Sequence, residues 1–177
     1  MALPLSYYGA PILRKKTKEI QEITPEIKEF ISKLKETLCS HDNGWGIAAN
    51  QVGSDLRLFI IYEINVDEKG DPIETGNILT FINPKIVRVG EEEISMTEGC
   101  LSIPGIYEDV VRPTCVEVEG LDEDGKKIKM VLDNYQARIF LHENDHINGV
   151  LFIDRLPKKI RLKCESKLKA LKKKHSK

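Results

Sequence analysis

Most of the strand-like segments in this 177-residue sequence follow one another, and two of the three helical patterns come after them. Each segment is rich in β-branched and aromatic residues and is bounded by turn-forming residues. An Asp-Gly pair between the last two segments predicts a hairpin. This order indicates an α+β fold with mostly antiparallel strands rather than alternating βαβ units. The segments are 57–66, 78–90, 115–121 and 126–132, and a turn is expected over 67–77.

Three other segments have the periodicity of amphipathic helices. A Thr-Pro pair, suited to an N-cap and a first helical position, precedes a helix expected over about 25–41. Asp133 or Asn134 could cap a second helix that runs to a glycine stop at Gly149. A third helix is expected over 158–174. We therefore expect strands packed around the central second helix, with one helix towards each end of the chain.

The composition is that of a single globular domain. Hydrophobic residues make up 41% and charged residues 31%. The cysteines Cys39, Cys100, Cys115 and Cys164 are widely spaced without a disulfide framework, and the first residues lack the pattern of a secretory signal. These features predict a cytoplasmic location. No apolar stretch approaches the ~20 residues that cross a bilayer, so no membrane association is expected.

The net charge of −1 hides an uneven distribution. Residues 158–177 contain ten Lys or Arg and one acid, Glu165, so they carry +9 and the rest of the chain carries −10. We expect one catalytic domain over 1–157 and a basic C-terminal helix or tail over 158–177. Such a tail suits a polyanionic partner. A solvated lysine-rich helix surface is the alternative.

Residues 142–146 read HENDH, an H-E-x-x-H pattern on the second predicted helix. Positions i and i+4 share one helix face, so His142 and His146 can bind one metal ion. Glu143 is rotated by about 100° and can reach a water on that ion. This arrangement serves metal-assisted hydrolysis, in which the ion acidifies water and a carboxylate takes its proton.

A chance match is the alternative for such a short pattern. Against chance, the helix face with Tyr135 and Ile139 is apolar apart from the two histidines, which therefore point inward. A catalytic site of this kind needs a third protein ligand and an open position. Asp154, Glu165 and His175 lie downstream, but not at the spacing of zinc endopeptidases. An upstream thiolate such as Cys100 is an obvious choice, although a small buried cysteine is the commoner role.

Three motifs together resemble those of the peptide deformylase family. They are GWGIAANQ at 44–51, EGCLS at 98–102 and HENDH at 142–146, in the family's order and separation. Shorter similarities, such as NGVLFIDRL at 148–156, extend the resemblance over about 1–165. Because three independent motifs agree, the resemblance is highly specific.

The resemblance implies a catalytic site. Cys100 would be the third metal ligand, beside His142 and His146. The family usually uses Fe²⁺ in the cell, and Zn²⁺, Ni²⁺ or Co²⁺ could occupy the purified protein. The implied reaction removes the formyl group from the N-terminal formylmethionine of new polypeptides and releases formate. Glu143 would be the general base.

The remaining implied roles concern the formyl oxygen and the peptide. The Leu101 backbone N–H and the Gln51 side-chain amide would stabilise the oxyanion. Gly44 and Gly46 would bring backbone close to an extended peptide. A methionine pocket would be lined by Trp45, Ile139 and His142.

Several positions depart from the family pattern. Trp45, Ile47, Asn50 and Leu141 replace commoner residues, and Trp45 and Leu141 bear on side-chain selectivity. Core packing is the alternative role of Trp45. Asp145 is expected to orient a ligand, or else to lie on the outer surface.

Two other functions compete with this interpretation. One is a zinc endopeptidase, which the missing downstream ligand disfavours. The other is a ribosome- or RNA-binding module that works through the basic tail. In some deformylases a C-terminal helix docks on the ribosome, so this role is compatible with catalysis. Sequence-specific nucleic-acid binding is not expected.

Overall fold

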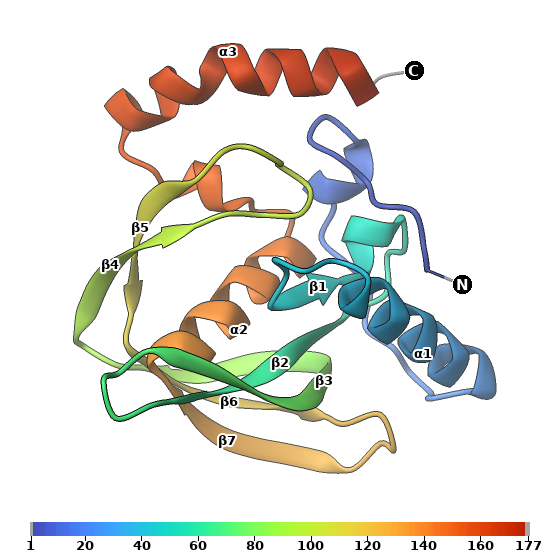
Figure 1. The fold of residues 1–177 in the computed structure, drawn as a ribbon. Helices are drawn as coiled ribbons and strands as arrows, with labels where there is room; N and C mark the ends of the chain where they lie inside the picture. Colours follow the sequence, from blue (N-terminus) through green and yellow to red (C-terminus); the bar gives the residue numbers. More distant parts are fainter. Residues whose placement is uncertain (1, 176–177) are drawn as a thin grey trace.

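The computed structural model describes residues 2–175. Within them, antiparallel strands form a five-stranded sheet in the order β1-β2-β3-β6-β7 and a separate β4–β5 hairpin (Figure 1). The strands are β1 (Gly46–Ala48), β2 (Leu58–Val66), β3 (Pro72–Val89), β4 (Glu93–Glu98), β5 (Glu108–Pro113), β6 (Cys115–Leu121) and β7 (Lys127–Asp133).

The helix α2 (Asn134–Ile147) lies between the five-stranded sheet and the β4–β5 hairpin (Figure 1). Helix α1 (Pro25–Cys39) packs beside β1, and α3 (Lys158–His175) lies over the hairpin side of the molecule. Short 3₁₀ helices are η1 (Pro11–Arg14), η2 (Ala49–Val52) and η3 (Phe152–Asp154). The predicted α+β fold, with strands around a central helix and one helix towards each end, is confirmed.

Apolar side chains pack on both sides of α2. Phe140 of α2 contacts Phe59 and Phe81 of the large sheet, with ring centroids 5.1 and 5.0 Å away. On its other side, the His142 ring of α2 stacks on Phe152 with ring centroids 6.1 Å apart, and Phe152 belongs to a second apolar cluster with Leu168 of α3. The helix α2 is therefore held from two directions. Buried on most of its sides, it provides a rigid support for the side chains that it presents.

The predicted elements differ from the structure mainly at their ends. The strand β3 begins at Pro72, inside the stretch expected to form a turn, so the turn is confined to about 67–71. Asp133 occupies the N-cap position of α2, but its side chain makes no capping hydrogen bond. The hairpin at Gly125, with φ of +81°, is present between β6 and β7. The β4–β5 hairpin was not predicted.

None of the helices within residues 2–175 has both the length and the apolar character required to cross a membrane.

Candidate metal centre and active-site cleft

The side chains of Cys100, His142 and His146 meet beside α2. The two histidines lie one helical turn apart, and Cys100 lies in the turn that follows β4. One ligand atom from each lies within 4.8 Å of the others, and the Cys100 Sγ is 3.2 Å from His146 Nε2. One thiol and two imidazoles are a donor set that suits ferrous iron or zinc. The residues present therefore fit a divalent metal ion.

The pKa values of the two imidazoles shift in opposite directions. Burial by itself lowers the pKa of both rings. For His142, contacts with the Cys100 thiol and the Glu98 carboxylate outweigh burial and raise the pKa well above its ordinary value. For His146, burial and the neighbouring charge of His142 lower the pKa well below the ordinary value, so this ring is neutral. Since metal ligands bind without their protons, a divalent ion would displace the proton from His142.

Glu143 lies in the cleft beside the cluster. It is 3% exposed, and within residues 2–175 its Oε2 has no hydrogen-bond partner. Burial raises the pKa of Glu143 to about 7. A carboxylate with a pKa near neutrality can both accept and return a proton. A Cβ added to Gly46 would lie 2.8 Å from both Cγ and Oε1 of Glu143, so the glycine leaves room for this side chain.

Glu98 was not among the functional residues predicted from the sequence. Its Oε2 accepts a hydrogen bond from His142 Nδ1 at 2.9 Å, and it also pairs with Arg112 and Arg138. Burial alone would raise the pKa of Glu98, but hydrogen bonds from Arg112 and His142 hold it well below its usual range. Such a carboxylate fixes the orientation of a metal-binding imidazole. The sequence feature that could have identified Glu98 is its position at the start of the EGCLS motif.

Gln51 of η2 faces Cys100. Its Nε2 lies 3.6 Å from Cys100 Sγ and donates to Ser102 Oγ at 3.2 Å. Its Oε1 accepts from the Ala48 backbone N–H at 2.8 Å, which fixes the amide orientation. Leu101, the residue after Cys100, lines the same cleft. The structure thus brings together the two residues expected to stabilise an oxyanion.

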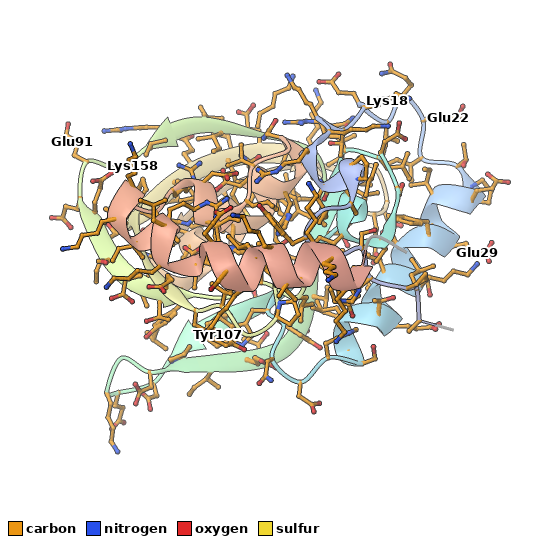
Figure 2. All side chains as sticks on the ribbon, turned by 90° about the horizontal axis from the view of Figure 1, so that it is seen from above. Lys18, Glu22, Glu29, Glu91, Tyr107 and Lys158 are labelled. Carbon is orange, nitrogen blue, oxygen red and sulfur yellow. The ribbon has the colours of Figure 1, made fainter. Side chains whose placement is uncertain are left out.

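The cleft in front of the cluster has a volume of about 510 Å³. All the residues expected to contact the peptide or its methionine side chain line it, namely Gly44, Trp45, Gly46, Ile139 and His142. The Trp45 ring contacts Tyr135 edge-on, with ring centroids 5.9 Å apart, and it packs against the core as well as lining the cleft. Tyr107, 65% exposed, stands at the cleft and at the molecular surface (Figure 2).

Asp145 does not lie on the outer surface. It is 6% exposed and pairs with Arg112 at 2.8 Å and with Arg155 at 2.5 Å. It contacts neither histidine directly through a side-chain hydrogen bond among the described residues. Asp145 is instead connected to His142 by a chain of hydrogen bonds that passes through Arg112 and then Glu98.

The chain is similar to known proteins in sequence and in overall fold. The family model described as polypeptide deformylase matches residues 2–161. A peptide deformylase of Borreliella burgdorferi is 40% identical over 161 residues, 91% of this chain and 92% of the relative. The structure of a plant peptide deformylase superposes with a TM-score of 0.87 at 34% sequence identity. The matched region covers 98% of this chain and 90% of the plant chain. The structure of a Synechococcus elongatus peptide deformylase in complex with actinonin has a TM-score of 0.82 at 39% sequence identity. The matched region covers 93% of this chain and 85% of that chain.

Proposed function

Because the chain belongs to the polypeptide deformylase family, we propose that it removes the formyl group from the N-terminal formylmethionine of new polypeptides and releases formate. The observation that carries this proposal is the meeting of Cys100, His142 and His146 beside the buried carboxylate of Glu143. The family match also removes the reason to consider a zinc endopeptidase.

The proposed metal ligands are Cys100, His142 and His146. When bound, a divalent ion would supply Lewis acidity that activates water and polarises the formyl carbonyl. Fe²⁺ is the proposed ion in the cell, while Zn²⁺, Ni²⁺ or Co²⁺ would also suit these donors. The thiolate would limit the choice to ions that accept sulfur.

The proposed general base is Glu143. It would take a proton from the attacking water and return it to the departing amine, which requires a pKa near the working pH. The Gln51 amide and the Leu101 backbone N–H would donate hydrogen bonds to the formyl oxygen as negative charge develops there. Each such donor is worth roughly 10²–10³ in rate.

The proposed substrate site is the cleft that contains Gly44, Trp45, Gly46 and Ile139. Backbone groups at the two glycines would pair with an extended peptide, largely independently of its sequence. The apolar surface of Trp45 and Ile139 would receive the methionine side chain. This mode of binding suits an enzyme that acts on most new chains.

Formate release from a short formylmethionyl peptide tests the proposal. The protein is purified without oxygen, and its metal content and rate are compared with those of Glu143→Ala. We expect the variant to keep its metal and to lose roughly 10²–10⁴ in kcat, the range for a general base. A parent that releases no formate would refute the function, and equal rates in the two proteins would refute the assigned base.

We also propose that α3 holds the enzyme at the ribosome, in the cytoplasm, through its lysines. Lys158 lies at the start of this helix (Figure 2), and Lys163 and Lys167 are exposed on it. Co-sedimentation with ribosomes should fall steeply with salt, because phosphate contacts release counterions. Lys163→Glu with Lys167→Glu should weaken co-sedimentation and leave turnover of a short peptide unchanged. Co-sedimentation that is insensitive to both changes would contradict this role.

A further inference from the structure

Arg112 of β5 is a buried cation that the proposed reaction does not use. Its side chain is 2% exposed and is among the largest fully buried side chains of the described residues. The guanidinium forms two parallel hydrogen bonds with Glu98, Nε to Oε1 at 2.5 Å and Nη2 to Oε2 at 2.9 Å. Its remaining nitrogen, Nη1, donates to Asp145 Oδ2 at 2.8 Å. All three guanidinium nitrogens are therefore occupied by two carboxylates.

These two carboxylates belong to the segments that carry the proposed metal ligands. Glu98 ends β4, two residues before Cys100, and its carboxylate also accepts the hydrogen bond from His142 Nδ1. Asp145 is the residue before His146 on α2. One guanidinium thus connects the loop of the thiol ligand with the helix of both imidazole ligands.

We infer that Arg112 is a positioning residue, which sets the distance between the Cys100 loop and α2 so that sulfur and imidazole nitrogens can share one ion. A guanidinium suits this role because its planar fork reaches a carboxylate with two bonds and still has a donor for another. A lysine at this position carries the same charge but only a single ammonium, which cannot reproduce the fork. The inference rests on the proposed metal site and extends it to a residue outside the cleft.

A purely structural role for Arg112 is the competing explanation. Removing a buried charge partner destabilises a protein whether or not a metal site is nearby. The test must therefore report on the ligand geometry and not only on folding. Cobalt bound by a thiolate has a charge-transfer band in the near ultraviolet, and its release to a chelator can be timed without any substrate.

The experiment loads metal-free parent and Arg112→Lys with Co²⁺ and records both readouts. We expect the folded variant to release Co²⁺ about 10–100-fold faster, the usual cost of losing a residue that orients metal ligands, and its thiolate band to shift or weaken. Arg14→Lys is the matched control, since Arg14 pairs with Asp154 outside the site. Its release rate and band should equal those of the parent.

If Arg112→Lys does not fold, Asp145→Asn tests the same link from α2, because within residues 2–175 the Asp145 carboxylate makes no hydrogen bond with a ligand side chain. Faster cobalt release in this variant would again support the inference. Folded variants with the parent's release rate and band would overturn it. A parent that binds no cobalt through a thiolate would instead contradict the proposed metal site, so the two failures can be told apart.

Discussion

The position of the proposed base, Glu143, depends on the absence of a side chain at Gly46. Glu143 lies on α2 with its carboxylate against the backbone of β1, where a Cβ at Gly46 would come within 2.8 Å of it. Real Cβ atoms do not approach other atoms so closely, so either Glu143 or β1 would have to move. Both are buried, and a well-packed interior leaves little room for such a shift. Glycine at this position is therefore needed by the enzyme's own carboxylate.

Gly46→Ala is expected to lower kcat for formate release by roughly 10²-fold, since a displacement of about an ångström in a catalytic group has that cost. Metal content should stay unchanged, because no ligand touches the added methyl group directly. Steady-state kinetics with metal analysis checks both expectations. Gly44→Ala is the comparison for kcat and not for KM, since Gly44 also lines the substrate cleft, while its Cβ would meet the flexible ends of Leu101 and Leu38 instead of Glu143. A Gly46→Ala enzyme with the parent's kcat would show that Glu143 does not require this space.

The residues of the site differ in how far the sequence reveals them. His142, Glu143 and His146 follow a helical spacing, so their shared location could be predicted from the chain alone. Cys100 could be placed only through the resemblance, because nothing in a single sequence says which distant segment reaches α2. Glu98 and Arg112 were missed as a pair. A buried ion pair has no periodic signature, and both residues look like surface residues when read in order.

The β4–β5 hairpin was missed for a related reason at the level of elements. The inner face of this hairpin holds Glu98 and Arg112 beside Val110, where a strand normally has apolar residues. The alternation that identifies a half-buried strand is therefore masked by charges. By contrast, β2, β6 and β7 were recognisable because apolar side chains alone cover the core. Strands with apolar buried contacts could therefore be predicted from the sequence, whereas the strands with buried ion pairs could not.

The short helices η1 and η3 are joined by an ion pair. Arg14 donates to both carboxylate oxygens of Asp154, which also accepts from the Leu151 backbone N–H. Burial alone would raise the pKa of Asp154, but these hydrogen bonds lower it. Since the folded protein depresses this pKa, the pair stabilises the fold above the unfolded pKa of about 3.9 and its contribution is lost as pH falls through the folded value.

Asp154→Asn should therefore reduce the free energy of unfolding at pH 7 by about 1 kcal/mol, the upper range for a partly exposed pair. The difference between variant and parent should begin to shrink as the pH falls below about 4, because the unfolded parent then binds a proton, and it should vanish once the folded parent is protonated as well. Urea denaturation at pH 7, 5 and 3.5 measures this. Asp42→Asn, at an exposed position, should change stability by no more than about 0.5 kcal/mol. A difference that is undiminished at the lowest pH would point to packing instead of charge.

The molecule as a whole combines an acidic body with a basic helix that is packed against it. The helix α3 buries Cys164 and Leu168 and turns its lysines outward. His175 near its end stacks on Tyr7 at 4.0 Å, and Arg161 lies 3.4 Å from the Tyr8 hydroxyl. These contacts link the last helix to the first residues of the chain. We therefore expect α3 to fold with the body, although the change in charge at residue 158 suggested a separate tail.

Leu168→Ala tests whether α3 is part of the cooperative unit. The side chain is 1% exposed and belongs to the cluster that contains Leu13 and Phe152, so its truncation should lower the free energy of unfolding by roughly 2–5 kcal/mol. Leu162, 61% exposed on the same helix, is the control, and Leu162→Ala should change stability by no more than about 0.5 kcal/mol. A single calorimetric transition, shifted down only in the first variant, is the expected result. An unchanged main transition in Leu168→Ala would mean that the helix is detachable, and the stability of the catalytic body would then be independent of whatever binds the lysines.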